Sequence, residues 1–217
     1  MKKRRGFSLV EITAATLISS FIAVSLATIY SASNRHIFQN FRSNTIKSDV
    51  SLGMHAIRNV MAQATRIEDD APTLGSDGSR LELAVNVDQL TGCNPISSFE
   101  AEMPAWHLFC TSGGNLYHHT GVYPTVAGPA CGCPNNCATV NPAHTTVCGT
   151  GGTLLTKFLD ETIPVFSRVA GDIPSGNPMA VRVLLRARWS PPASLTASQR
   201  AVDHTLSSIF MVSRSGN

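Results

Sequence analysis

The chain has 217 residues, of which 43% are hydrophobic and only 14% are charged. A typical soluble chain carries about 25% charged residues, so this composition excludes an intrinsically disordered chain, a collagen and a coiled-coil rod. The net charge is +3, but four of the 17 basic residues are Lys2, Lys3, Arg4 and Arg5. The other 13 basic residues stand against 14 acidic ones, so no basic surface remains to favour a nucleic-acid partner.

A long apolar segment, residues 7–30, follows the basic N-terminus and contains one charged residue, Glu11, and no Gly or Pro. A helix of this length measures about 36 Å, enough to cross a bilayer core of about 30 Å. The apolar part of a cleaved signal peptide has only about 7–15 residues. Length therefore favours a spanning helix, although small residues at 31–33 offer a weak cleavage site. The basic N-terminal flank predicts a cytoplasmic N-terminus, with the rest of the chain outside the cytoplasm.

Glu11 is unexpected within an apolar span, where a carboxylate costs at least about 2.5 kcal/mol. Residues 7–34 contain no Lys, Arg or His to pair with it. In one interpretation the carboxyl group is hydrated at the interface or protonated. In the other it pairs with an α-amine. Cleavage between Gly6 and Phe7 would create such an amine one helical turn from Glu11, within reach of the same chain or of a neighbouring chain.

Residues 3–12, Lys-Arg-Arg-Gly-Phe-Ser-Leu-Val-Glu-Ile, resemble the leader and N-terminus of type IV pilins and type II secretion pseudopilins. In that family a prepilin peptidase cuts after the glycine and N-methylates the next residue. The resemblance implies that residues 1–6 are a leader ending at Gly6, that Phe7 is the methylated N-terminus, and that Glu11 guides assembly with other minor and major pilins. One departure is Thr28, in a region where many major pilins carry a helix-kinking proline.

Small residues recur every four positions along the apolar segment, at Ala15, Ser19, Ala23 and Ala27. Such a face lets helices approach closely in lipid, where no hydrophobic effect drives them together. The alternative is that Ala and Ser are simply common in spanning helices. We expect this stripe to contribute to helix packing.

Residues 31–71 are predicted to continue the helix into the periplasm, because no proline occurs before Pro72. A helical apolar stripe supports this prediction: Ile46, Val50, Met54, Ile57, Met61 and Ala64. Gly53 lies within the stripe and lowers helix propensity by about 1 kcal/mol relative to alanine. A helix over residues 7–67 would be about 90 Å long. Its second half requires a partner surface, most simply a sheet of the same chain.

Residues 72–217 are predicted to form a globular, β-rich head. Candidate strands are residues 80–87, 106–110, 115–118, 180–189 and 206–212, with Gly113-Gly114 as a hairpin turn. Residues 154–159 are a short strand or a short helix. No crossover helix separates these strands, so we expect an antiparallel sheet and an α+β fold with a long N-terminal helix. The last part, from residue 180, resembles W-type minor pilins and their J-type pseudopilin counterparts.

All six cysteines lie in this head: Cys93, Cys110, Cys131, Cys133, Cys137 and Cys148. An even number of cysteines outside the cytoplasm predicts disulfides. Proximity favours Cys93 with Cys110 and the other four among themselves, which would cross-link the Gly- and Pro-rich loop 128–152. The alternative is zinc, held by cysteines of this loop with His144. Oxidation competes with zinc binding in the periplasm.

Other candidate chemistry is sparse. His118 and His119 would point to opposite faces of a strand, and we expect them to be exposed at its end. The acidic clusters 68–70 and 160–161 are expected to be solvated. The chain contains no nucleophile elbow, zinc-protease motif, P-loop or dinucleotide fingerprint, so we predict neither an enzyme nor a bound cofactor.

Together these features predict a minor pilin that primes a type IV pilus or sits at its tip. Its expected location is the bacterial inner membrane, single-pass with a periplasmic head, and then the pilus. Its expected partners are prepilin peptidase and other pilins. Three alternatives stay open: a type II secretion pseudopilin, an adhesive or metal-binding tip module, and a membrane-anchored periplasmic protein with an uncleaved span.

Overall fold

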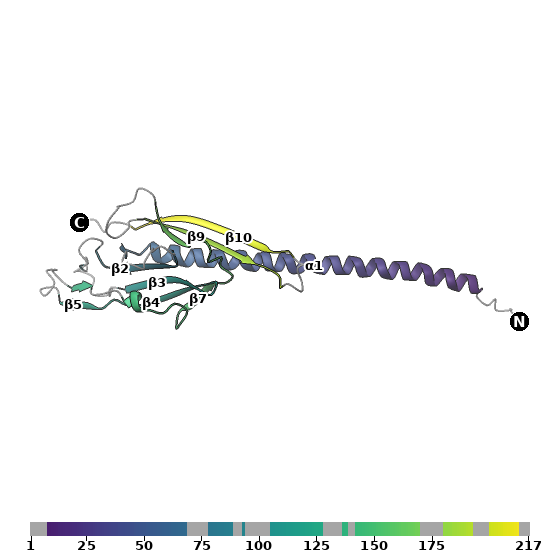
Figure 1. Cartoon of the computed structure of the whole chain (residues 1–217), viewed down its shortest axis with the longest axis horizontal. Helices are drawn as coiled ribbons and strands as arrows, with labels where there is room; N and C mark the ends of the chain where they lie inside the picture. Colours follow the sequence, from purple (N-terminus) through teal and green to yellow (C-terminus); the bar gives the residue numbers. More distant parts are fainter. Residues whose placement is uncertain are drawn as a thin grey trace. The chain divides into compact units, whose positions relative to one another are not determined.

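A computed structural model of the chain describes residues 8–68, 78–88, 93, 105–127, 136–138, 142–169, 180–192 and 200–212. The chain divides into two compact units. One comprises Met1–Arg42 and Pro191–Arg200, and the other comprises Ser43–Ser190 and Ala201–Asn217. A single helix, α1 (Leu9–Met61), contributes to both units (Figure 1).

Helix α1 has 53 residues and is about 80 Å long. It is shorter than the predicted range 7–67, because Arg66–Ile67 form strand β1, which pairs with β2 (Arg80–Val85). The backbone of β1 thereby gains ladder hydrogen bonds and Ile67 becomes fully buried, which the helix continuation would not provide. The helix is unbroken at Thr28, whose hydroxyl donates to the carbonyl of Ser25.

The strands of the described residues form three antiparallel sheets, which confirms the predicted α+β class. The first has five strands in the order β1-β2-β3-β4-β7, with β3 at Ala105–Ser112, β4 at Asn115–Val122 and β7 at Thr153–Thr156. The second has the order β10-β9-β8, with β8 at Phe166–Arg168, β9 at Ala180–Trp189 and β10 at Val202–Met211. The third pairs β5 (Thr125–Ala127) with β6 (Asn136–Ala138), and a short 3-10 helix, η1, spans Pro142–Thr145.

The predicted hairpin is present between β3 and β4. Gly113 and Gly114 have φ values of 58° and 73°, the left-handed region that a two-residue turn between twisted strands requires. Strand β9 has the predicted range 180–189, and its residues alternate: Val181, Val183 and Leu185 are buried, while Arg182 and Arg188 are exposed. Residues 154–159 were expected to form a short strand or a short helix, and residues 154–156 belong to strand β7.

The second half of α1 forms the centre of the hydrophobic core. Its buried residues Ile46, Val50, Ile57 and Met61 pack with side chains from both larger sheets, among them Leu83, Phe109, Leu116, Phe166, Val183 and Leu185. Gly53 lies where α1 comes close to the strands of the sheets. A Cβ added to it would stand 2.3 Å from Thr156 Oγ1 and 3.3 Å from Leu185 Cδ1. The glycine that weakens the helix in isolation is therefore needed for its packing.

Candidate functional site

The first half of α1 is apolar and unburied. No residue from Leu9 to Tyr30 is buried, and large side chains such as Phe21 and Tyr30 are 67% and 70% exposed. The most apolar window of the helix has a mean hydropathy of 2.0 and is long enough to cross a membrane. An apolar surface of this extent needs a lipid or protein environment to cover it.

Five hydroxyl groups in this half of the helix are satisfied within the helix itself. Thr13, Thr16, Ser20, Ser25 and Thr28 each donate to a backbone carbonyl three or four residues earlier, at 2.7–3.0 Å. A polar group without a partner is costly in a bilayer, where no water is available. These five side chains are therefore compatible with lipid.

Glu11 and Ser8 form a capping box at the start of α1. The Ser8 N–H donates to Glu11 Oε2 at 2.9 Å, and the Val10 N–H donates to Ser8 Oγ at 3.2 Å. These bonds satisfy backbone donors that have no partner within a helix. The Ser-x-x-Glu spacing is a known signature of this motif, and our sequence interpretation overlooked it. The carboxylate thus points back toward the Ser8 N–H, at the first described residue of the chain.

Glu11 also lines a shallow groove with Ile12, Ala15, Thr16 and Ser19. The groove follows the predicted small-residue stripe, of which Ala23 and Ala27 are the exposed continuation. Gly6 and Phe7, the predicted cleavage and methylation positions, lie outside the described residues.

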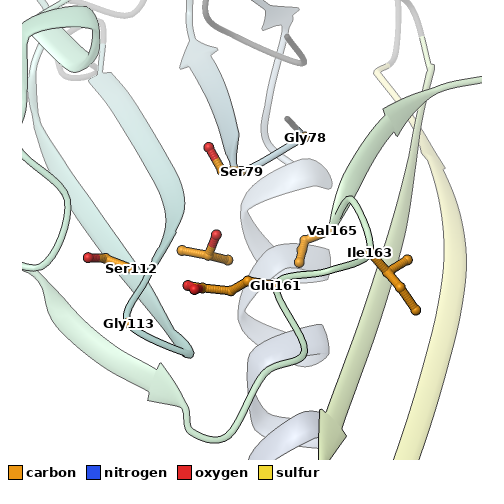
Figure 2. Close-up of a pocket in the computed structure, with 8 residues that line it drawn as sticks. Gly78, Ser79, Ser112, Gly113, Glu161, Ile163 and Val165 are labelled. Carbon is orange, nitrogen blue, oxygen red and sulfur yellow. The ribbon is translucent and has the colours of Figure 1, made fainter. Parts of the chain in front are cut away.

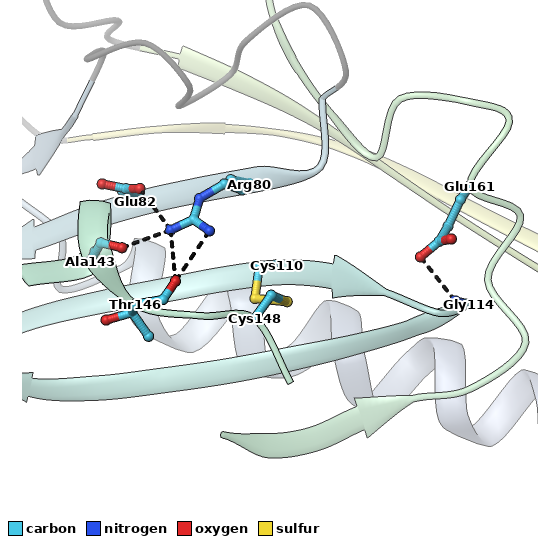
Figure 3. Close-up of a disulfide and its surroundings, with 8 residues drawn as sticks. All are labelled: Arg80, Glu82, Cys110, Gly114, Ala143, Thr146, Cys148 and Glu161. Atoms are coloured by element: carbon cyan, nitrogen blue, oxygen red, sulfur yellow. Dashed lines mark hydrogen bonds and ion pairs between the residues drawn. A yellow bond between two sulfur atoms is a disulfide. The ribbon is translucent and has the colours of Figure 1, made fainter. Parts of the chain in front are cut away.

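In the other unit, the segment 142–152 packs on the face of the five-stranded sheet that points away from α1. Ala143 and Cys148 join Leu108 and Cys110 in a small core there, and Cys110 forms a disulfide with Cys148 (Figure 3). The predicted pairing of Cys93 with Cys110 is therefore wrong. Proximity in sequence favoured the wrong partner for Cys110. The antiparallel β3–β4 hairpin and the return of the chain bring Cys148, 38 positions further along, next to it. Cys93 is disulfide-bonded too. Cys131, Cys133 and the side chains of Cys137 and His144 lie outside the described residues.

Arg80 fastens this segment to the sheet. Its guanidinium donates to the carbonyl of Ala143 at 2.7 Å and to that of Thr146 at 3.3 Å, and it pairs with the fully buried Glu82 at 3.3 Å (Figure 3). Arg80 and Glu82 alternate with apolar residues along β2, a pattern typical of a strand with one face in solvent. The alternating pattern gave no sign that a distant loop covers that face.

His118 and His119 do point to opposite faces of β4, but the expectation that they are exposed at its end is wrong. Toward α1, His118 stacks on Phe109 and shares a hydrogen bond of 3.0 Å with His107. Burial first, and then the charges of His107 and His119, lower the pKa of His118 to about 4. On the other face His119 is only 6% exposed, and burial followed by the charge of Arg80 lowers its pKa.

The acidic cluster at 68–70 is also not simply solvated. Glu68 is 3% exposed, pairs with Arg66 at 3.1 Å and accepts a hydrogen bond from the Tyr123 hydroxyl at 3.2 Å. Burial, and then the charge of Glu68, raise the pKa of Tyr123. Both sheet faces thus contain buried polar side chains with specific partners.

A polar cavity of about 310 Å³ lies beside the β3–β4 turn (Figure 2). It is lined by Gly78, Ser79, Thr111, Ser112, Gly113, Glu161, Ile163 and Val165. Glu161 is the one titratable side chain among these lining residues, and its carboxylate accepts a hydrogen bond from the Gly114 N–H at 2.9 Å. A single carboxylate engaged in a turn provides neither a pair of acid and base groups nor an activated nucleophile.

Comparison with protein-family models, with curated proteins and with solved structures gave no match to this chain. The architecture itself is pilin-like: a long N-terminal helix, apolar in its first half, packs through its second half on antiparallel sheets. That class of fold, with one helix able to span a membrane, is what the structure defines.

Proposed function

We propose that this chain is a minor pilin, a structural subunit that is processed by prepilin peptidase and incorporated in a type IV pilus. One observation carries the proposal: the same helix is wholly unburied over its apolar first half and forms the core of the head over its second half. A subunit that moves from a bilayer into a helical filament core needs such a helix, because lipid covers it before assembly and neighbouring helices cover it afterwards.

The proposed mechanism begins with cleavage after Gly6 and methylation of the new Phe7 amine. The apolar helix then leaves the bilayer and packs against other subunits along the small-residue stripe. Glu11 pairs with an α-amine in the filament, because a buried carboxylate requires an opposite charge. The capping box supports this step, since it directs the Glu11 carboxylate toward the end of the helix where the amine would form.

A priming or tip position fits the head better than a place in the shaft. In the head, the segment 142–152 covers the outer face of the main sheet and is linked to β3 by a disulfide, and such a surface suits a subunit present in few copies. A type II secretion pseudopilin would use the same helix, so the machine that incorporates the chain distinguishes the two.

An adhesive role of the segment 142–152 is a second candidate. Deleting that segment and scoring attachment separately from piliation would test it.

The decisive experiment is the N-terminus and intact mass of the chain extracted from native membranes. We expect a chain that begins with N-methylated Phe7 and is lighter by two hydrogens for each disulfide. A chain beginning at Met1 would indicate an ordinary membrane anchor. One beginning near Asn34 would indicate a secreted protein. Either result would contradict the proposal.

The role of Glu11 can be separated from its capping role with a matched pair of variants. We predict that Glu11→Ala strongly reduces the fraction of the chain recovered in sheared filaments, while membrane insertion is unchanged. Ser8→Ala removes the serine cap, worth about 1 kcal/mol, but keeps the charge, so it should leave incorporation nearly intact. If Ser8→Ala were as damaging as Glu11→Ala, helix capping rather than charge pairing would explain the effect.

A further inference from the structure

Two sulfur atoms and an imidazole meet on the outer face of the five-stranded sheet. The ligand atoms of Cys110, His119 and Cys148 all lie within 4.8 Å of one another. Cys110 and His119 are diagonal neighbours on β3 and β4, since Cys110 pairs with Tyr117 and Leu108 pairs with His119. Cys148 arrives from the covering segment.

His119 is the unusual member of this cluster. The residue is 6% exposed, and its Nε2 atom is buried with no hydrogen-bond partner among the residues that the structure describes. Buried side-chain nitrogens nearly always have a partner, so an orphaned one requires an explanation. Arg80 stands directly across from Cys110 on β2. Its guanidinium binds the carbonyls of Ala143 and Thr146, so it holds the covering segment that carries Cys148 against the sheet.

We propose that the thiol form of this head binds one Zn²⁺ ion through Cys110, Cys148 and His119. Every chain is synthesised with thiols, so this form precedes the disulfide. Two thiolates and one neutral imidazole are a ligand set that zinc prefers, and three protein ligands leave a fourth position for water. The ion would hold the segment 142–152 on the sheet before any covalent link exists.

The zinc-bound thiol form is then converted to the disulfide by a two-electron oxidation. Binding of Zn²⁺ releases the two thiol protons. A disulfide oxidant next accepts two electrons from the two thiolates and becomes two thiolates itself. The bond between the sulfurs of Cys110 and Cys148 forms, and Zn²⁺ leaves. The segment stays in the same place in both states, because the same two cysteines anchor it.

The test uses the full chain in detergent, reduced with a phosphine and titrated with Co²⁺ as a spectroscopic probe for Zn²⁺. We expect the strong visible bands of tetrahedral Co²⁺ with thiolate charge transfer, displaced by added Zn²⁺ and absent from the oxidised chain. His119→Gln should weaken binding by at least about tenfold, the lower end of the loss caused by removing even an outer-shell partner. His107→Gln, on the opposite face of the same hairpin, is the control and should leave binding unchanged.

Alkylation of individual cysteines, mapped by mass spectrometry, identifies the ligands directly. Zn²⁺ should protect Cys110 and Cys148 in the parent chain and fail to protect them in His119→Gln. Protection of other cysteines instead, or a Co²⁺ spectrum indifferent to His119→Gln, would overturn the proposal. If the reduced chain loses its near-UV circular dichroism, recovery on adding Zn²⁺ supports the site, and no recovery contradicts it.

Discussion

Replacing Gly53 by alanine tests the close approach of α1 to strand β7, and intrinsic propensity and packing predict opposite results. In an isolated helix the change is favourable by about 1 kcal/mol. In this structure the new Cβ would lie 2.3 Å from Thr156 Oγ1, 3.2 Å from Leu116 Cδ2 and 3.3 Å from Leu185 Cδ1. Thr156 cannot yield freely, because it is 1% exposed and its hydroxyl donates to the Asp49 carbonyl at 2.9 Å.

The magnitude follows from three contributions. Overpacking of a close-packed core costs about 1–3 kcal/mol. Displacement of the Thr156 hydroxyl from its hydrogen bond costs about 1 kcal/mol more. After the propensity gain is subtracted, Gly53→Ala should lower the free energy of unfolding by about 1–3 kcal/mol. For a domain of this size that corresponds to roughly 2–4 °C in Tm for each kcal/mol.

The assay is thermal unfolding of the full chain in detergent, followed by near-UV circular dichroism. Leu52→Ala, at a neighbouring helix position that is 57% exposed, is the control and should change stability by no more than about 0.5 kcal/mol. Adding Thr156→Ala to Gly53→Ala removes the clashing oxygen. The double variant should therefore lose less free energy of unfolding than the two single variants lose when their losses are added. A rise in Tm for Gly53→Ala alone would refute the reasoning, because it would mean that the helix does not approach the sheets this closely.

Three further predictions concern the head. Arg80→Leu removes the ion-pair partner of a buried carboxylate and two carbonyl contacts, so it should cost about 3 kcal/mol and expose the segment 142–152 to proteases, whereas the exposed Arg182→Leu should change stability by no more than about 0.5 kcal/mol. The pKa of His118 is lowered to about 4 from an unfolded value near 6.5, so the stability that neutral His118 contributes is fully present above pH 6.5 and is lost as the pH falls toward 4. Because the side chain is only half-buried, the loss in the free energy of unfolding is about 1–2 kcal/mol. His118→Gln should therefore make Tm depend less on pH in this window. Replacing Cys110 and Cys148 together by serine should destabilise the head by about 4 kcal/mol in the chain-entropy model for a separation of 38 residues, measured under oxidising conditions; an unchanged Tm would mean that the covering segment is held by other contacts.

The local elements were predictable because their determinants are local. The stripe from Ile46 to Met61, the alternation in β9 and the Gly113-Gly114 turn each follow from the period of their own element. The end of α1 was not predictable from the same information. Residues 62–67 contain no helix breaker, and β1 forms because β2, distant in sequence, offers it a pairing edge.

The contact at Gly53 and the disulfide pairing have a common reason for escaping prediction. Both depend on where segments more than 35 residues apart come to lie, and a periodic pattern contains no such distances. The capping box is different, since Ser8 and Glu11 are three residues apart and the motif is visible in the sequence. Glu11 thus has an ordinary role at a helix start in addition to its unusual place within an apolar span.

One physical feature explains the remaining differences at the site. Strands β2, β3 and β4 are covered on both faces, by α1 on one and by the segment 142–152 on the other, so Glu82 and His119 are buried and His118 is half-buried. The expectation that His118 is exposed was therefore wrong, and both Glu82 and His118 have partners in the interior. A sheet covered on both faces tolerates polar side chains when they are paired. His119 breaks that rule through its Nε2 atom, and it does so beside two cysteines, which is why the outer face favours a metal-binding thiol form over a purely structural histidine.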